Sequence, residues 1–401
     1  MTRVVIIGAG QAGARAALTL RDMGWDGEIM VIGEEPLPPY ERPPLSKEVL
    51  LGITEGGDAR IAAEEDYAER KIQIRLDTQV VNVDFNVNSM ELQTGEQIAY
   101  DHLIFATGAR ARPLSVSGSE LEGVFTLRSA EDSTALRSAL GKAKRVAIIG
   151  GGFVGLEVAA AARRLDVEAV VLEQAPTCLS RTLPSAAVDP ILKLHSDNDV
   201  DILCNSTVVA LEGNDRVKAV LLGNGTTVQT DLVVVGIGSI ANDELASAAG
   251  IACANGIIVN DECRSSKSNV YAIGDVAAHL DHASGRGFRL ESWENAERQA
   301  ERVAASITGT PARETLAPWF WTDQYDLNVQ IVGSPGPEDE LLVRAGAAPG
   351  QFIQIYLRDG MMVGAVMFNS GREKRTLVKL VGQTIDPARM LDPKIPLRQN
   401  I

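Results

Sequence analysis

A strand, a glycine-rich turn and an alanine-rich helix occur twice in this sequence of 401 residues, about 140 residues apart. The first copy is RVVII followed by GAGQAG (Gly8 to Gly13), and the second is RVAII followed by GGGFVG (Gly150 to Gly155). Each turn runs into a helical pattern, from Ala14 to Met23 and from Leu156 to Leu165. A repeat of this kind predicts two βαβ units with parallel sheets in one chain.

After each helical pattern comes an apolar strand that ends in acidic residues. The first strand leads to Glu34 and Glu35, and the second leads to Glu173. In such a turn the first glycine permits a tight bend, the second lets the backbone approach a pyrophosphate, and the third lets the helix pack on the sheet. A carboxylate at the end of the second strand can then accept hydrogen bonds from a ribose. Both copies therefore predict dinucleotide binding.

The rest of the sequence predicts further buried strands and a separate C-terminal domain. Apolar runs begin at His102 and Asp231, and a third run, VYAIGD, delivers Asp275 at its carboxyl end. Alanines and charged residues follow helical spacing from Ser292 to Ile307. Aromatic residues and strand-like alternation characterise the last 90 or so residues, so we expect an α+β domain from about Leu316 onward.

Composition excludes several classes of protein. Lys and Arg number 38 against 53 Asp and Glu, and the resulting net charge of −15 argues against nucleic acid as a partner. No apolar run reaches the roughly 18 residues of a membrane span, and the four cysteines, which lack CxxC spacing, indicate free thiols in the cytoplasm. We expect no metal site and only structural or surface roles for the histidines, which are His102, His195, His279 and His282.

Several segments together form a pattern that is more specific than any one of them. They are GAGQAG at Gly8, YERPPLSK at Tyr40 to Lys47, ATGAR at Ala106 to Arg110, GGGFVGLE at Gly150 to Glu157, VGIG at Val235 to Gly238, YAIGD at Tyr271 to Asp275, ESWENAERQA at Glu291 to Ala300, and PWFWTDQYD at Pro318 to Asp326. With this set the sequence resembles, over nearly its whole length, the FAD-dependent NADH:ferredoxin reductases of oxygenase electron-transfer systems, the family of putidaredoxin and rhodocoxin reductases.

The resemblance implies an α/β fold with two Rossmann-like dinucleotide-binding domains, of the glutathione-reductase type, and a C-terminal α+β domain. The expected boundaries are 1–112 with 237–315 for a discontinuous FAD-binding domain, 113–236 for the NAD-binding domain and 316–401 for the C-terminal domain. We expect a monomer or weak dimer. One departure from the family pattern is the segment from Asp197 to Val200, where a glycine is usual; we expect it to alter only a turn.

In the first unit the resemblance implies bound FAD, and it favours Glu34 over Glu35 for the adenosine ribose. Lys47 is expected beside the isoalloxazine, where an ammonium would stabilise incoming electron density; an exposed lysine at a helix start is the alternative. Asp275 is either an acceptor for the ribityl or phosphate region, the N-cap of the next helix, or both. Trp293 begins a helix whose N-terminus is expected to face the flavin pyrimidine ring. The complete predicted set is Gly8, Gly10, Ala12, Gly13, Glu34, Lys47, Val80, Arg128, Asp275 and Trp293, with Val80 alternatively an ordinary core residue.

In the second unit the resemblance implies that Gly150, Gly152 and Gly155 hold the nicotinamide dinucleotide. A carboxylate at Glu173 would accept both ribose hydroxyls and repel a 2′-phosphate, which favours NADH over NADPH. Family position puts Glu157 near the nicotinamide carboxamide, and an acidic residue that merely stabilises the first turn of a helix is the alternative. Lys47 and Glu157 are the predicted catalytic residues.

The implied reaction passes a hydride from NADH to flavin N5, after which electrons leave singly for a [2Fe-2S] ferredoxin that serves a cytochrome P450 or a Rieske-type oxygenase. Ferredoxins are usually acidic, so a chain of net charge −15 needs a local basic docking patch. The candidate cations, for which a solvated charge run is the alternative, are Arg372, Lys374, Arg375, Lys379, Arg313 and Arg344.

Two other functions are compatible with this architecture. A disulfide reductase needs a cysteine pair after the first unit, but the first cysteine of the sequence is Cys178. The remaining alternative is an NADH-sensing flavoprotein similar to apoptosis-inducing factor, or another pyridine-nucleotide oxidoreductase without a ferredoxin partner.

Overall fold

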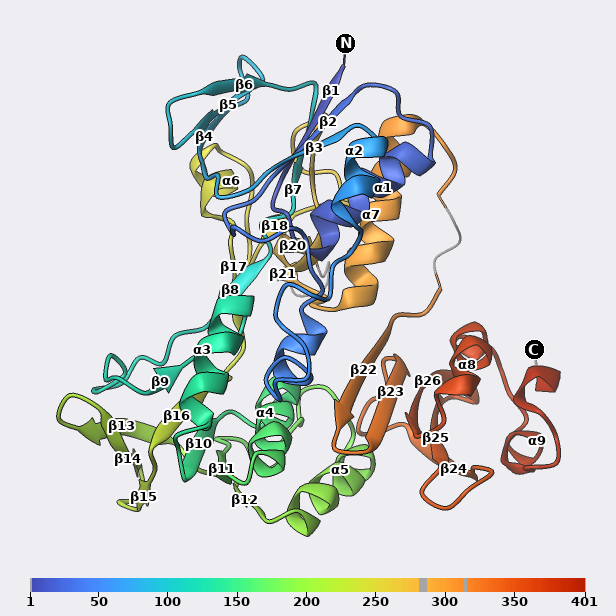
Figure 1. Cartoon of the computed structure of the whole chain (residues 1–401). Coiled ribbons are helices and arrows are strands. Elements are labelled where there is room, and N and C mark those ends of the chain that lie inside the picture. The colour runs from blue at the N-terminus through green and yellow to red at the C-terminus, as the bar shows by residue number, and fades with distance from the viewer. Residues whose placement is uncertain (1, 281–286, 313–315, 401) are drawn as a thin grey trace. The chain divides into compact units, whose positions relative to one another are not determined.

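The computed structural model describes residues 2–280, 287–312 and 316–400, and the chain forms two compact units (Figure 1). Unit 1 comprises Met1–Pro43, Glu55–Arg110 and Ser239–Glu314, and unit 2 comprises Pro44–Thr54, Ala111–Gly238 and Thr315–Ile401. The two copies of the repeat fall in different units.

Unit 1 is built on a parallel sheet of five strands in the order β19-β7-β1-β2-β3. The strands are β1 (Arg3–Ile7), β2 (Glu28–Ile32), β3 (Ile72–Arg75), β7 (His102–Phe105) and β19 (Val270–Ala272). The central strand β1 is apolar on both faces because the sheet is covered on both sides. Helices α1 (Gln11–Asp22) and α7 (Trp293–Thr308) pack together through alanines on one face, and the short helix α2 (Glu64–Glu69) precedes β3.

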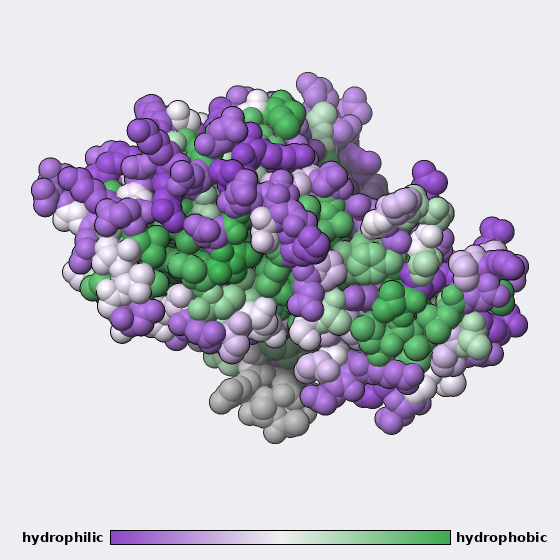
Figure 2. Space-filling view, turned by 90° about the horizontal axis from the view of Figure 1, so that it is seen from below, coloured by the Kyte–Doolittle hydropathy of each residue, from purple (hydrophilic) through white to green (hydrophobic). Residues whose placement is uncertain are grey.

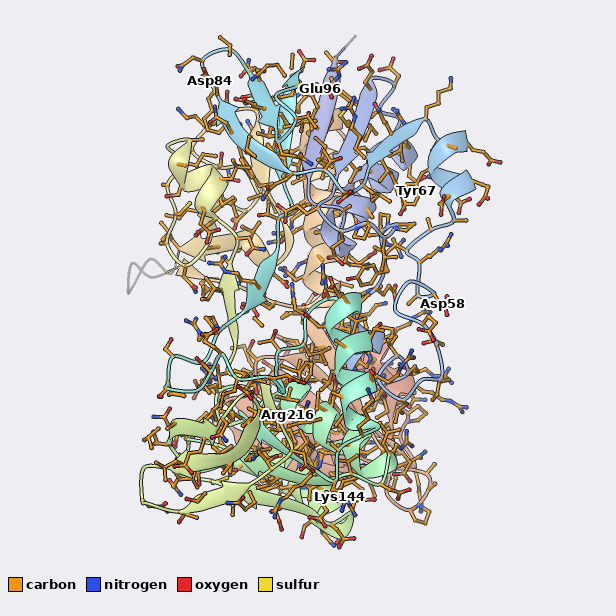
Figure 3. The ribbon with its side chains drawn as sticks, turned by 60° about the vertical axis from the view of Figure 1, so that its left-hand side comes forward. Asp58, Tyr67, Asp84, Glu96, Lys144 and Arg216 are labelled. Carbon is orange, nitrogen blue, oxygen red and sulfur yellow. The ribbon has the colours of Figure 1, made fainter. Side chains whose placement is uncertain are left out.

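Smaller elements complete unit 1. An antiparallel sheet is formed by β4 (Val80–Asp84), β5 (Ser89–Leu92) and β6 (Gln97–Ala99), and Figure 3 labels Asp84 and Glu96 on it. The remaining elements are β8 (Ala109–Ala111) paired with β17 (Ser239–Ala241), a sheet of β18 (Ile257–Ile258), β20 (Ala277–Leu280) and β21 (Gly287–Phe288), helix α6 (Glu244–Ala248) and the 3-10 turn η2 (Gly274–Val276).

Unit 2 contains a second parallel sheet of five strands, in the order β12-β11-β10-β16-β9. Its strands are β9 (Val124–Phe125), β10 (Arg145–Ile149), β11 (Glu168–Leu172), β12 (Val200–Leu203) and β16 (Leu232–Val235), and its helices are α3 (Ala130–Leu140), α4 (Phe153–Arg164) and α5 (Ser185–Asp197). An antiparallel sheet of β13 (Val208–Gly213), β14 (Val217–Leu222) and β15 (Thr227–Gln229) precedes β16, as β4-β5-β6 precedes β7 in unit 1. Arg216, which Figure 3 labels, lies in the turn between β13 and β14. Its guanidinium pairs with Glu122 at 2.7 Å. The duplication therefore extends beyond the segments recognised in the sequence.

The predicted C-terminal α+β part is an antiparallel sheet in the order β22-β23-β26-β25-β24 with two short helices. Its elements are β22 (Trp319–Gln324), β23 (Leu327–Gly333), β24 (Glu340–Ala345), β25 (Phe352–Arg358), β26 (Met361–Phe368), η3 (Gly371–Glu373), α8 (Lys374–Leu380), α9 (Pro387–Leu391) and η4 (Leu397–Asn400). Tyr356 and Phe368 share one hydrophobic core with Val146 and Leu156, so the two parts of unit 2 are packed together.

Local boundaries differ from the predicted ones for identifiable reasons. Helices α1 and α4 begin immediately after Gly10 and Gly152, earlier than predicted, because the third glycine of each turn lies inside the helix. The strand that leads to Asp275 ends at Ala272 and continues as η2. At the departure from the family pattern, Asp199 itself adopts the left-handed conformation with φ +56°, so the turn forms without glycine.

The surface shown in Figure 2 is mixed, with hydrophobic areas lying among hydrophilic residues. Apolar residues that reach solvent include Val209, Leu341 and Val343. Every helix in the described ranges is too short or too polar to span a bilayer.

Candidate dinucleotide and electron-transfer site

In unit 1 the glycine turn between β1 and α1 has no room for side chains at two positions and open space at a third. A Cβ on Gly8, which has φ +115°, would lie 2.1 Å from the carbonyl oxygen of Ala106, and a Cβ on Gly13 would lie 2.0 Å from the oxygen of Gly8. A Cβ on Gly10 would have no neighbour within 4 Å. The fold thus requires the first and third glycines, while the middle one faces space that a phosphate can occupy.

The turn between β10 and α4 in unit 2 repeats this arrangement. Gly150, with φ +109°, would place a Cβ 2.3 Å from the oxygen of Gly236, and Gly155 would place one 2.1 Å from the oxygen of Gly150. Gly152 again has nothing within 4 Å. The predicted turn glycines therefore form two cradles of the same design.

The N-termini of the two helices are suited to bind an anion. Gly10 and Gly152 are the N-cap residues, and neither α1 nor α4 has a side-chain cap. By contrast, Ser129 and Ser292 cap α3 and α7 with their hydroxyls. The first amides of α1 and α4 are thus available to a pyrophosphate, whose charge the helix dipole would also stabilise.

The two acidic residues after β2 have different surroundings. Glu35 pairs with Arg42 at 2.7 Å and accepts a hydrogen bond from the Tyr40 hydroxyl. Burial lowers the pKa of Arg42, but the neighbouring Tyr40 and Glu35 raise it by a larger amount. The net shift of this pKa is therefore upward. Glu34 is exposed and has no hydrogen bond or ion pair within the described part of the chain. This difference fits the preference for Glu34 as the ribose ligand, which stays a prediction.

The other residues predicted for FAD are divided between the units. Asp275 lies in η2, and Gly274 before it is so close to α1 that a Cβ there would be 2.9 Å from the Cβ of Ala12. Trp293 is the first residue of α7, as predicted, and its Nε1 donates to Glu41 at 3.3 Å. Val80 lies in the hydrophobic core of unit 1. Lys47 and Arg128 belong to unit 2, where Arg128 directly precedes the N-cap of α3.

The carboxylate of Glu173 is held against the second glycine turn. Its Oε2 accepts from the Gly151 amide and its Oε1 from the Ala175 amide, both at 2.7 Å. A carboxylate oxygen accepts about two hydrogen bonds, so each retains one site for a ribose hydroxyl. Beside this turn, burial raises the pKa of the Cys178 thiol to about 12, which keeps it un-ionised and unreactive at neutral pH.

The structure brings the two predicted catalytic residues together in unit 2. Lys47 Nζ lies 3.0 Å from Glu157 Oε1, and both side chains are largely buried, with 12% and 5% of their surface exposed. Glu157 also accepts hydrogen bonds from Ser46 at 2.5 Å and from Thr322 at 2.6 Å. A buried ion pair requires such additional hydrogen bonds, because its charges have lost their water.

Three of the predicted docking cations, Arg372, Arg375 and Lys379, are exposed on η3 and α8. Lys374 lies over the ring of Trp319, 3.3 Å from its centroid. Arg344 was wrongly assigned to this surface. It is buried, and its guanidinium donates to the carbonyl oxygens of the C-terminal segment at Met390, Asp392 and Ile395. Arg313 lies outside the described residues.

Sequence reasoning did not connect three further residues to this site: Thr322, which bonds to Glu157, and Gln324 and His195, which are linked to it through Thr322. Thr322 and Gln324 on β22 received no role, and His195 on α5 was expected to be structural or exposed. His195 is fully buried and bonds to Gln324. The available signal was the spacing of Thr322 and Gln324, which are two positions apart in WFWTDQ and therefore lie on one face of the strand.

Two parallel sheets, each with a glycine cradle and an acidic residue at a strand end, define a two-dinucleotide oxidoreductase. The family profile described as pyridine nucleotide-disulphide oxidoreductase matches residues 2–300, and the profile described as reductase C-terminal matches residues 319–401. The chain belongs to the pyridine nucleotide-disulphide oxidoreductase family, and it is an oxidoreductase that uses FAD and NAD(H). The predicted family, fold class and cofactors are confirmed.

Relatives are similar over nearly their whole length. The 3-phenylpropionate/cinnamic acid dioxygenase ferredoxin–NAD(+) reductase component of Photorhabdus laumondii is 36% identical, with 96% of this chain and 97% of the relative covered. Rhodocoxin reductase of Rhodococcus erythropolis is 35% identical, with 98% and 93% covered. Among solved structures, the covalent putidaredoxin reductase–putidaredoxin complex matches with a TM-score of 0.91 and 34% identity, covering 99% of this chain and 97% of that chain. The ferredoxin reductase for the CYP199A2 system of Rhodopseudomonas palustris matches with a TM-score of 0.93 and 34% identity, covering 100% and 99%.

Proposed function

We propose that this chain transfers electrons from NADH, through FAD, to a small ferredoxin that serves a cytochrome P450 or a Rieske-type oxygenase. The observation that carries this proposal is the presence of two glycine cradles in one chain, each with an open middle glycine. Two different dinucleotides in one protein are most simply explained by electron transfer between them. The names of the full-length relatives support a ferredoxin as the acceptor.

FAD fits the cradle of unit 1. The amides at the start of α1 would hold its pyrophosphate, and Glu34 would bind its adenosine ribose. Asp275, which follows Gly274 in η2, would bind its phosphate or ribityl region. When bound, FAD supplies the conversion between a two-electron donor and a one-electron acceptor. The position of Lys47 beside its ring stays a prediction from the resemblance.

NADH fits the cradle of unit 2. The amides of α4 would hold the pyrophosphate, and the free acceptor site on each oxygen of Glu173 would bind a ribose hydroxyl. The same negative charge would repel the 2′-phosphate of NADPH. The geometry therefore supports NADH as the electron donor.

Glu157 is proposed to bind the nicotinamide end, with its carboxylate held by Lys47. Lys47 and Thr322 both contact Oε1 of Glu157, whereas Ser46 is the one donor to Oε2 among the described residues. Since a carboxylate oxygen accepts about two hydrogen bonds, Oε2 keeps one site for the amide of a nicotinamide carboxamide. Lys47 holds the carboxylate in place for that contact.

The exposed cations of η3 and α8 are the proposed docking surface for an acidic ferredoxin of the [2Fe-2S] type. Arg372, Arg375 and Lys379 make up this basic surface. We further propose that the chain works in the cytoplasm as a monomer or weak dimer; its four cysteines, all free, fit a reducing compartment.

An anaerobic titration with NADH tests this function. We expect rapid bleaching of the flavin absorbance on addition of NADH. Addition of a [2Fe-2S] ferredoxin should then reoxidise the flavin, and the reduction of the ferredoxin is monitored by its own absorbance spectrum. The control is NADPH at the same concentration, which should bleach the flavin far more slowly.

A reduced complex that is long-lived and does not respond to any ferredoxin would contradict the proposal. That outcome is the one expected of an NADH-sensing flavoprotein. A screen of ferredoxins encoded near the gene, with cytochrome c as the final acceptor, separates a wrong partner from a wrong function.

A further inference from the structure

A row of buried polar side chains connects α5 to the Lys47–Glu157 pair within unit 2. His195 Nε2 lies 2.6 Å from Gln324 Oε1, Gln324 Nε2 lies 3.1 Å from Thr322 Oγ1, and Thr322 Oγ1 lies 2.6 Å from Glu157 Oε1. His195 and Thr322 are fully buried, and Gln324 is 1% exposed.

Three elements place these side chains next to one another. Thr322 and Gln324 are two positions apart on β22 and therefore point to the same face of the sheet. Phe320 precedes them on that face and contacts Phe153 of α4, with ring centroids 4.8 Å apart. Helix α5 contributes His195 from its last turn. The proximity of α4, α5 and β22 can be followed in Figure 1.

The chemistry of the groups fixes the direction of every hydrogen bond. A carboxylate only accepts, so Thr322 must give its single hydroxyl proton to Glu157. Thr322 then accepts, and the donor is the amide nitrogen of Gln324. The amide oxygen of Gln324 therefore faces His195, which must donate from Nε2.

His195 is suited to end this chain as a neutral donor. Burial lowers its pKa, and the hydrogen bond to Gln324 offsets that shift only in part. A neutral imidazole carries one N–H, which the direction of the chain assigns to Nε2. Its Nδ1 is buried and has no hydrogen-bond partner among the described residues, as an unprotonated nitrogen in an apolar setting can be.

We infer that His195, Gln324 and Thr322 are positioning residues, which fix the Glu157 carboxylate through three hydrogen bonds that all run toward it. Hydrogen bonds aligned in one direction polarise and strengthen one another in a buried setting. Thr322 and Lys47 hold Oε1 and Ser46 holds Oε2, so rotation of the carboxylate is restrained and the free acceptor site of Oε2 keeps its direction. This inference rests on the proposed role of Glu157 at the nicotinamide.

Nitrogen NMR of the holoenzyme labelled only in histidine tests the relay itself. His195 is assigned by the signal lost in His195→Gln, and we expect a neutral ring protonated at Nε2. Thr322→Val and Glu157→Gln should both shift this signal, although neither residue contacts the ring. Thr230→Val is the control, because it removes another buried hydroxyl of unit 2, 5% exposed, outside the relay.

Anaerobic stopped-flow measurements test the consequence for the reaction. Thr322→Val should slow flavin reduction by NADH about tenfold, the scale expected for the loss of one hydrogen bond to a charged group. Thr322→Ser keeps the hydroxyl and should restore most of the rate. Thr230→Val should leave the rate unchanged even if it lowers the melting temperature.

The possible failures are distinguishable. A His195 ring protonated at Nδ1, or a signal that does not respond to Thr322→Val, overturns the relay. If Thr322→Val reduces the flavin as fast as the wild type while Glu157→Gln is slow, the positioning role is wrong and the proposed function stands. If Glu157→Gln is also as fast as the wild type, the proposed role of Glu157 fails independently of the NMR result.

Discussion

Each carboxylate oxygen of Glu173 accepts a hydrogen bond from a backbone amide, and each has a second acceptor site for a ribose hydroxyl. The bonds from Gly151 and Ala175 fix its orientation before any ligand arrives. A preorganised acceptor loses less side-chain freedom on binding, so its contribution to selectivity is larger.

Removing this carboxylate should change the choice of coenzyme. Glu173→Ala is expected to lower the ratio of kcat/KM for NADH to kcat/KM for NADPH by about tenfold or more. The hydrogen bonds from the ribose hydroxyls of NADH to a charged acceptor are lost, and the repulsion of the 2′-phosphate of NADPH disappears. Glu173→Gln is the matched variant, since it retains an acceptor for the turn but not the charge. An unchanged ratio in both variants would contradict NADH selection by this residue.

At the level of single residues, sequence reasoning succeeded where a motif fixed the position. Lys47 and Glu157 were selected through the resemblance, and the structure shows them paired. The bond between His195 and Gln324 could not be predicted, because its partners are 129 residues apart and meet only after β22 packs beside α5. Arg344 was misjudged because a cation in an edge strand usually faces solvent, whereas this one satisfies three carbonyls of a later segment.

The two glycine turns separate the needs of folding from the needs of binding. In each turn the first glycine adopts a positive φ against a neighbouring carbonyl, and the middle glycine has open space around it. Substitutions at the two positions should therefore have different effects, although the positions are two residues apart.

Gly152→Ala should leave the melting temperature nearly unchanged and weaken NADH binding about tenfold or more, since a methyl group would enter the space for the pyrophosphate. Gly150→Ala should lower the free energy of unfolding by about 2 kcal/mol or more, because its φ is positive. Thermal unfolding and NADH titration of both variants provide the check. Equal loss of stability in the two would show that the middle glycine also serves the fold.

Among secondary-structure elements, the long apolar ones were predictable and the short ones were not. Strands β1 and β10 are buried on both faces, and their continuous apolar runs identified them. The three-stranded sheets were missed because their strands are short and half-exposed, as the pattern of β4 shows. The exact starts of α1 and α4 were missed because a glycine inside a first turn looks like loop.

The net charge of the whole molecule and the charge of its proposed docking surface have opposite signs. A chain at −15 repels an acidic partner at long range, so a local cluster of cations must dominate at close approach. On α8 the apolar residues Leu377 and Leu380 are buried, and Arg375 and Lys379 remain exposed.

Reversing the charges of Arg375 and Lys379 to glutamate should lower kcat/KM for the ferredoxin about tenfold at low ionic strength, and added salt should reduce the difference. The control reverses Lys142 and Lys144, which are exposed before β10, where Figure 3 labels Lys144. It changes the net charge equally. Reduction of a small neutral dye should be the same in both variants. If the two charge reversals lower kcat/KM for the ferredoxin equally, a local docking surface on α8 is excluded.

The path of the chain through the two units has a consequence for synthesis on the ribosome. The parallel sheet of unit 2 has all of its strands once residue 235 has been made, whereas the sheet of unit 1, begun at Arg3, receives its edge strand β19 only at Val270–Ala272. The sheet that starts second is thus complete first. Until β19 is added, the first sheet ends at β7, whose outer edge has no partner strand. An early contact with another nascent chain would form at this edge.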